Sequence, residues 1–159
     1  MSIFKPSYRF VNILEITPEN LKNAGAKAAL VDADNTLALH GSQEPFPGVP
    51  EWIRKTVGSG IPVIIISNNS KERIKPFASR LGVPYIEKSA KPLPNGFLKA
   101  CKKFGIKPRE AAVIGDRAEK DVEIGDLILH ALIEIAVAHS ELIKVAEHGH
   151  IQFVDVICH

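Results

Sequence analysis

The fold is decided by residues 28–37, AALVDADNTL. The first four are apolar, as in a strand buried on both faces, and polar residues begin at Asp32. Apolar runs at residues 62–67 and 111–115 also lead into polar residues. Segments with helical spacing of apolar residues separate these runs. This alternation predicts an α/β domain with three α/β/α layers around a mainly parallel sheet.

Caps and glycines set the expected bounds of the helices. Thr17 before Pro18 predicts the start of a short helix, and Ser70 predicts a second N-cap. Gly82 and Gly105 predict helix ends. Helical spacing is found in three segments, 49–57, 74–81 and 97–104, and a short strand is expected over 83–86. Further on, residues 127–137 fit a helix or a strand, 140–148 a helix and 151–157 a strand.

Composition indicates one ordinary globular domain. The chain has 159 residues, of which 45% are hydrophobic and 24% charged. The formal net charge of +2 gives no reason to expect nucleic-acid binding. Cys101 and Cys158 have neither metal-ligand nor disulfide-framework spacing, which favours free thiols in a reducing compartment, the cytoplasm, with Cys101 in the core.

The sequence leads us to expect neither a signal peptide nor a membrane-spanning segment. Its most apolar stretch, residues 127–138, falls short of the roughly 20 residues that a membrane helix needs. Residues 1–10 mix aromatic and basic side chains, which suits a peripheral contact with the inner face of the membrane. The simpler interpretation is a strap that packs on the domain.

Polar residues follow each predicted strand. They are Asp32 and Asp34 after the first, Ser67 and Asn68 after the second, Lys91 after the third, and Asp116 and Asp121 after the fourth. Such residue types are also common in turns and helix caps. However, the carboxyl ends of parallel strands share one edge of the sheet, where ligands bind. Their occurrence after every strand therefore predicts a functional site.

The acidic residues predict a metal site. Asp32 and Asp34 lie two residues apart on extended chain, so both side chains point to the same side and a cation is needed between them. Together with Asp116 they offer hard oxygen ligands that suit Mg²⁺ and a substrate phosphate. His148, His150 and His159 lack the spacing of a zinc site.

The remaining residues suit phosphoryl transfer. Candidate contacts for the phosphoryl group are Thr36 with its neighbouring backbone amides, Ser67, Asn68 and Lys91. Asp32 is the predicted nucleophile, because a carboxylate can form an aspartyl-phosphate. Asp34 is the predicted general acid and base.

Four motifs resemble those of the haloacid dehalogenase superfamily of phosphatases. They are Asp-Ala-Asp-Asn-Thr-Leu at 32–37, Ser-Asn-Asn at 67–69, Lys-Pro at 91–92, and Gly-Asp at 115–116 with Asp121. The resemblance implies a Mg²⁺-dependent phosphomonoesterase with a Rossmann-like (HAD-like) fold, in which Asp32 is the nucleophile and Asp34 the acid/base. It further implies metal binding by Asp116 and by the backbone carbonyl of Asp34. Asp121 would orient the metal shell or Lys91.

Within subclass IIIA, the chain resembles the YqeG-like subgroup over roughly residues 10–125. Ile-Thr-Pro-Glu-Asn-Leu at 16–21 and Ala-Lys-Pro at 90–92 carry this closer likeness. Related members include phosphatidylglycerophosphate phosphatases, so a phospholipid headgroup is a candidate substrate by similarity. Arg117 and Lys120 depart from the subgroup, and residues 123–159 match it poorly.

The gaps between motifs are too short to hold a cap domain, which implies an open site. We expect residues 1–159 to form one phosphatase domain: an N-terminal strap and short helix (1–25), a catalytic core (26–125) and a C-terminal strand and helix region (126–159). Two alternatives remain. One is a phosphatase of a small soluble sugar or nucleotide phosphate, with a homo-oligomer covering the site. The other is a non-catalytic, receiver-like module that binds Mg²⁺ and phosphate.

Overall fold

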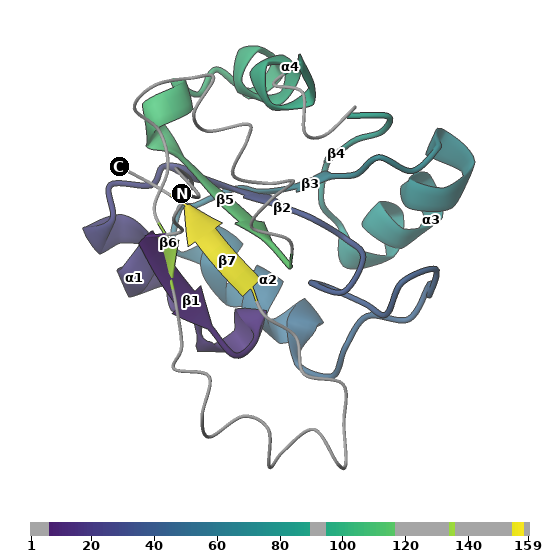
Figure 1. Cartoon of the computed structure of the whole chain (residues 1–159), viewed down its shortest axis with the longest axis horizontal. Helices are drawn as coiled ribbons and strands as arrows, with labels where there is room; N and C mark the ends of the chain where they lie inside the picture. The colour runs from purple at the N-terminus through teal and green to yellow at the C-terminus, as the bar shows by residue number, and fades with distance from the viewer. Residues whose placement is uncertain (1–6, 90–94, 117–133, 136–153, 158–159) are drawn as a thin grey trace, which may run out of the picture.

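The computed structural model describes residues 7–89, 95–116, 134–135 and 154–157. In these residues one sheet has the strand order β4-β3-β2-β5-β7-β1-β6 (Figure 1). The strands are β1 (Ser7–Phe10), β2 (Ala28–Val31), β3 (Val63–Ile66), β4 (Tyr85–Ile86), β5 (Ala111–Gly115), β6 (Glu134–Ile135) and β7 (Val154–Ile157). The helices are α1 (Pro18–Asn23), α2 (Val49–Gly58), α3 (Lys71–Leu81) and α4 (Asn95–Phe104), with 3-10 helices η1 (Ile13–Glu15) and η2 (Pro108–Glu110).

Strands β4, β3, β2 and β5 form a parallel half of the sheet. β2 pairs with β3 on one side and with β5 on the other, and β3 pairs with β4. The chain winds outward from β2 to β4 and then returns across β2 to form β5. The direction of winding thus reverses between β2 and β5, and ligands bind at such a point in open α/β sheets.

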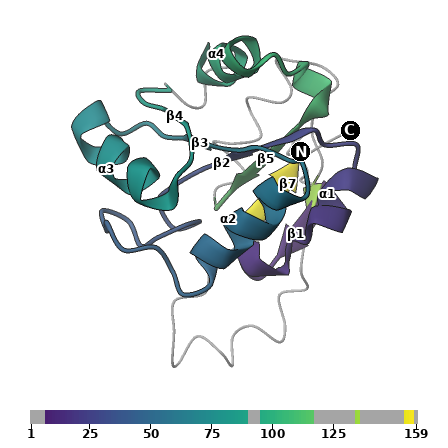
Figure 2. The same cartoon turned by 180° about the vertical axis from the view of Figure 1, so that it is seen from behind.

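Helices cover both faces of this half, which confirms the three-layer prediction. Ala29 and Val31 belong to a core cluster that includes side chains of α1, α2 and α3, whereas Leu30 belongs to a second cluster with side chains of α4. Alternate residues of β2 therefore face opposite layers, and every one of them is buried. Figure 2 shows α2 in front of the sheet, on the face turned away in Figure 1.

The ends of the helices agree with the signals in the sequence. Thr17 caps α1 in a capping box with Asn20, as the Thr-Pro pair predicts. Ser70 stands at the N-cap of α3, without a side-chain capping hydrogen bond, and Gly82 ends this helix with φ of 69°. Gly105 follows α4 with φ of 64°. These left-handed conformations explain the choice of glycine at both positions.

The other half of the sheet joins the two ends of the chain. β7 lies antiparallel to both β5 and β1, while β1 runs parallel to β6. The segment expected as a strap thus contributes strand β1. β7 confirms a strand within residues 151–157, and β6 shows that residues 134–135 are extended. The other predictions for 126–159, including the helix over 140–148, lie outside the described residues.

No inserted domain interrupts the chain between β2 and β4, all of which the structure describes. A loop and α2 connect β2 to β3, and a turn and α3 connect β3 to β4. The prediction of a fold without a cap domain is confirmed for these two connections. None of the described helices has the length and apolar character that a membrane crossing requires.

Candidate active site

Polar residues that follow the four parallel strands lie near one another at one edge of the sheet. Asp32 follows β2, and its backbone amide donates to the carbonyl of Ile114 in β5 at 2.8 Å. Asn35 Nδ2 donates to Asp116 Oδ2 at 3.1 Å, so Asp116 lies against the loop that follows β2. The residues after β2 and β5 therefore meet where the winding of the sheet reverses.

The loop after β2 is anchored in the core. The carbonyl of Ala33 accepts from the amides of Thr36, Leu37 and Ala38 at 3.4, 3.0 and 3.2 Å. Asn35 adopts φ of 59°, a left-handed conformation that asparagine tolerates better than most residues. Because Ala33 and Leu37 are buried, the tight turn holds Asp34 at the edge of the sheet.

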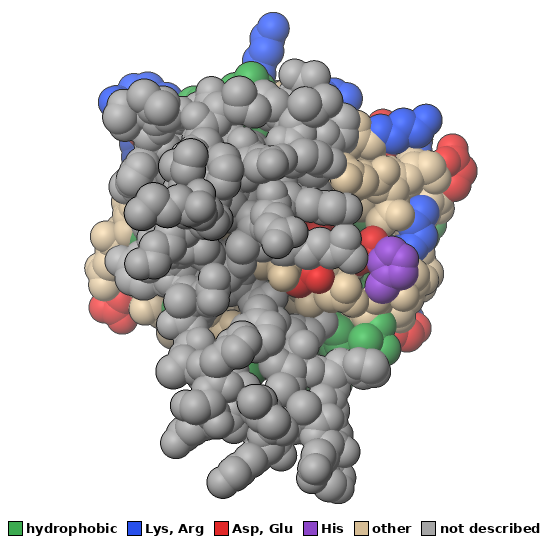
Figure 3. All heavy atoms as spheres, viewed as in Figure 1, with side chains coloured by type: hydrophobic (Ala, Val, Ile, Leu, Met, Phe, Trp, Pro, Cys, Tyr) green, Lys and Arg blue, Asp and Glu red, His purple; other side chains and the backbone are tan. Residues whose placement is uncertain are grey.

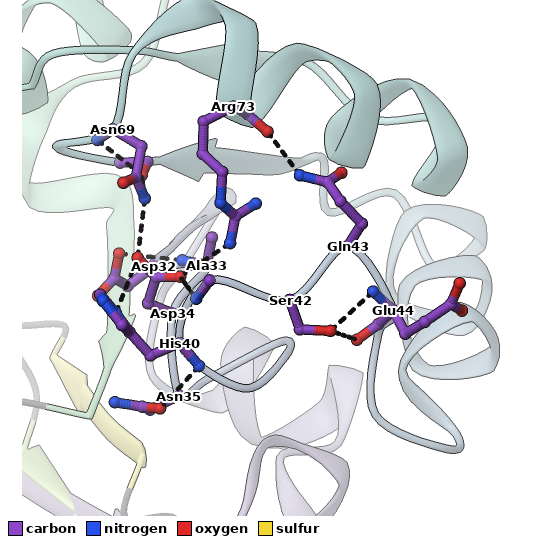
Figure 4. A network of polar contacts seen from close by, with 12 residues as sticks. Asp32, Ala33, Asp34, Asn35, His40, Ser42, Gln43, Glu44, Asn69 and Arg73 are labelled. Atoms are coloured by element: carbon purple, nitrogen blue, oxygen red, sulfur yellow. Dashed lines mark hydrogen bonds and ion pairs between the residues drawn. The ribbon is translucent and has the colours of Figure 1, made fainter.

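Asp34 is surrounded by protein donors (Figure 4). Asn69 Nδ2 donates to its Oδ2 at 2.8 Å, and Arg73 Nη2 and the Gly41 amide donate to its Oδ1 at 3.2 Å each. His40 Nδ1 lies 3.5 Å from Oδ2. Arg73, a residue that the sequence analysis did not single out, thus places a positive charge beside Asp34.

The carboxylates of Asp32 and Asp116 suit the predicted metal ion, whereas the carboxylate of Asp34 is engaged by other residues. In the described ranges no group of three or more His, Cys, Asp or Glu residues is arranged to hold a metal ion. The Asp34 carboxylate, expected among the ligands, faces Asn69 and Arg73 instead. Two carboxylates on neighbouring strand ends still suit Mg²⁺, which keeps several waters and binds through one or two carboxylates plus a substrate phosphate. The donor set therefore fits Mg²⁺ but not a closed carboxylate cage.

The turn after β3 is braced from two sides. The Oγ of Ser67 accepts from the backbone amide and the Nδ2 of Asn69, at 3.1 and 2.9 Å. From the other side, the amide of Ser89 donates to the Ser67 carbonyl at 3.0 Å, and its hydroxyl donates to Asn68 Oδ1 at 2.8 Å. In its contacts with Asn69 the Ser67 hydroxyl oxygen accepts, so its proton can donate to a phosphoryl oxygen.

One residue predicted to contact phosphate, Thr36, is buried in the structure, and two other predicted residues lie outside the described ranges. The Thr36 side chain is fully buried, and its Oγ1 has no hydrogen-bond partner within the described part of the chain. It therefore lies beneath the loop rather than at its surface. Lys91 and Asp121, together with Arg117 and Lys120, lie outside the described residues.

Sequence reasoning also missed Asn69, Ser89 and Gly96 as supports of the site. Asn69 stands inside the Ser-Asn-Asn motif, and it is Asn69 that contacts Asp34, whereas Asn68 accepts from Ser89. The Gly96 amide donates to the Ser89 carbonyl at 3.1 Å. A Cβ on Gly96 would lie 2.4 Å from Ser89 Cβ, so only glycine lets α4 start so close to this turn.

Polar side chains lie at the surface beside the site. Figure 3 shows a histidine next to acidic and basic side chains, with hydrophobic side chains below it. The His40 side chain is 75% exposed, whereas that of Asp34 is 18% exposed. The edge thus combines a shielded carboxylate with an accessible polar rim.

Comparison with known proteins identifies the class of enzyme that this fold and site define. The family model for haloacid dehalogenase-like hydrolases matches residues 3–125. The chain belongs to this family, as the four motifs indicate. It is also similar to "Probable phosphatase YqeG" of Bacillus subtilis (strain 168), with 36% identity over 139 residues that cover 87% of this chain and 81% of the relative. The subgroup resemblance seen in the sequence is confirmed.

Solved structures show more distant likeness. One is named "putative 3-deoxy-D-manno-octulosonate 8-phosphate phosphatase" from Vibrio cholerae, with 18% identity, a TM-score of 0.49 and coverage of 70% of this chain and 68% of that one. A hypothetical protein from Xanthomonas campestris has 17% identity, a TM-score of 0.46 and coverage of 63% and 60%. Likeness at this level says nothing about substrate.

Proposed function

We propose that this hydrolase is a Mg²⁺-dependent phosphomonoesterase that forms an aspartyl-phosphate on Asp32. Its family and its 36% identity to a relative named as a probable phosphatase support the phosphatase class. The observation that carries the mechanism is that the two aspartates of one motif have different surroundings. The Asp32 backbone amide donates to Ile114 in β5 and its Oδ1 accepts from the Ala33 amide, whereas the Asp34 carboxylate accepts from Asn69 and Arg73.

The proposed reaction has two steps. In the first, a carboxylate oxygen of Asp32 bonds to phosphorus as the bond from phosphorus to the leaving oxygen breaks, and Asp34 gives its proton to that oxygen. In the second, Asp34 takes a proton from water as the water oxygen attacks phosphorus and the bond to Asp32 breaks. Phosphate leaves, and both carboxyl groups return to their starting states.

Other residues stabilise charge on the phosphoryl oxygens. We assign this role to the Ser67 hydroxyl, to Asn68 and to Lys91. Mg²⁺, when bound by the carboxylates of Asp32 and Asp116 and the backbone carbonyl of Asp34, would neutralise part of this charge. Asp121 is assigned the orientation of the metal shell or of Lys91. Thr36 contributes through the turn that it supports.

The substrate is proposed from the shape of the site. With no domain inserted between β2 and β4, this edge of the sheet can admit a bulky phosphate, of which phosphatidylglycerophosphate is our first candidate. Access to a lipid headgroup would require a peripheral membrane contact. We place the enzyme in the cytoplasm, in keeping with the buried free thiol of Cys101. The alternative is a small soluble phosphate, with a second copy of the chain covering the site.

Hydrolysis assays on purified protein test this function. Phosphatidylglycerophosphate in liposomes and a panel of soluble sugar and nucleotide phosphates are compared in Mg²⁺, in EDTA, and after Mg²⁺ is added back. We expect sustained phosphate release that EDTA abolishes and Mg²⁺ restores. Turnover unaffected by EDTA would contradict the metal dependence. A single bound phosphate without turnover would favour the receiver-like module.

A further inference from the structure

We propose that Arg73 is a positioning residue that aims the Asp34 carboxyl group at the leaving group of the substrate. This inference rests on the proposed function, because it assigns Arg73 a part in the proton transfer by Asp34. It concerns a residue of α3 that lies outside the four motifs.

The first support is the contact itself. Arg73 Nη2 lies 3.2 Å from Asp34 Oδ1, and the two side chains are only 22% and 18% exposed. Both side chains are therefore partly shielded from water, and Asp34 can accept the hydrogen bond from Arg73 both with and without its own proton. Asn69 holds the other oxygen, Oδ2, at 2.8 Å. With a donor on each oxygen, the plane of the carboxyl group is fixed.

The second support is that Arg73 is itself held in place. Its backbone carbonyl accepts from Gln43 Nε2 at 3.0 Å. Farther along α3, Arg80 Nη1 donates to the Gln43 carbonyl at 3.0 Å and to Glu44 Oε1 at 2.6 Å. The same helix therefore holds both the carboxyl group of Asp34 and the loop that follows it (Figure 4).

The third support is a buried donor. Arg73 Nη1 is inaccessible to water and has no hydrogen-bond partner in the described ranges. An unsatisfied buried donor costs roughly 1–3 kcal/mol, and more on a charged group. A buried donor of this kind calls for an explanation, and a role in positioning a reacting side chain supplies one.

The chemistry makes the role measurable. Asp34 donates its proton to the leaving oxygen while the bond from phosphorus to that oxygen breaks and the bond from Asp32 to phosphorus forms. A weakly basic leaving group, such as 4-nitrophenolate, departs without being protonated. Phenolate is more basic, so its departure depends more on the proton from Asp34. Misaligned Asp34 would therefore slow the hydrolysis of phenyl phosphate more than that of 4-nitrophenyl phosphate.

The test is a series of substituted phenyl phosphates that differ in leaving-group basicity. kcat/KM is measured for the wild type, Arg73→Gln, Arg73→Lys and Asp34→Asn. Lys75→Gln is the matched control, because it removes an exposed cation from the same helix, and the structure describes no contact between Lys75 and Asp34. We expect Arg73→Gln to lose about tenfold to a hundredfold more activity on phenyl phosphate than on 4-nitrophenyl phosphate. Asp34→Asn should show a larger difference, Arg73→Lys a smaller one, and Lys75→Gln none.

Each other outcome has a definite meaning. An equal loss along the whole series would overturn the inference, since it would indicate a role in phosphate binding or folding. Unchanged kinetics in Arg73→Gln would overturn it too. Thermal unfolding shows whether the variants are folded. If Arg73→Gln is unfolded, the inference is judged on Arg73→Lys, from how its loss of kcat/KM depends on the basicity of the leaving group. Failure of the wild type to hydrolyse any phosphate ester would instead contradict the proposed function itself.

Discussion

The parallel half of the sheet and its mixed half differ in origin and in contribution. β4, β3, β2 and β5 come from one continuous stretch of chain, and the described contacts of the site follow these strands. β7, β1 and β6 come from opposite ends of the chain and extend the sheet beyond β5. The mixed half therefore covers an edge that would otherwise expose unpaired backbone groups, while the parallel half builds the chemistry.

A substitution within the site is the strongest test of the claim that the parallel half builds the chemistry. Asp34→Asn keeps the shape of the side chain but removes its proton transfer. We expect kcat/KM for phenyl phosphate to fall by about a hundredfold to ten-thousandfold, while the protein stays folded at the assay temperature. Enzyme kinetics and circular dichroism measure the two quantities. Near wild-type activity on phenyl phosphate would show that Asp34 is not the acid.

The core under α3 gives the largest expected effect on stability. Phe77 is 1% exposed and packs in the cluster between the sheet and α3. Phe77→Ala should lower the free energy of unfolding by about 3–5 kcal/mol, as in other cores where a phenylalanine is truncated. Urea unfolding measures this. A loss below about 1 kcal/mol would mean that α3 does not pack on the parallel half as described.

A smaller effect is expected in the mixed half. Phe10 ends β1 and is a partly buried side chain at the margin of the same cluster. Phe10→Ala should lower the free energy of unfolding by about 1–2 kcal/mol, because less apolar area is lost than at Phe77. The turnover of folded protein should not change. A tenfold drop in kcat would place the mixed half in the site and contradict the division between the halves.

The parallel half was predictable because its signals are local. The apolar run before Asp32, the cap at Thr17 and the glycine at position 82 each act within one element or turn. Once the strands are parallel, topology alone brings the residues after β2 and β5 to one edge. The position of Asp116 beside the loop after β2 could therefore be inferred without coordinates.

Two features could not be predicted, for different physical reasons. β1 pairs with β7 through contacts such as Tyr8 with Val156, which are nearly the whole chain apart, and no local pattern specifies such a partner. Arg73 follows Lys71 and Glu72 and reads as one more solvated charge. Its contact with Asp34 depends on the packing of α3 against the sheet, which only the structure gives.

The smallest predicted effect concerns α4. Burial raises the pKa of the Cys101 thiol from 9.0 to about 11. Between these values the unfolded chain loses this proton more readily than the folded protein does. The thiol's contribution to stability is thus full below pH 9 and falls as the pH rises toward 11. Urea unfolding at several pH values should show that the free energy of unfolding declines less steeply above pH 9 in Cys101→Ala than in the wild type. The same decline in both proteins would mean that the thiol is accessible to water.

The central claim is that Asp32 carries the phosphoryl group, and trapping that intermediate tests it most directly. The protein is mixed with a phosphate ester, quenched in acid within the first turnover, digested and analysed by mass spectrometry, with Asp32→Asn as the control. We predict one phosphoryl adduct on Asp32, absent from the variant, and no turnover by the variant. Wild-type turnover by Asp32→Asn, or an adduct on another residue, would contradict the account.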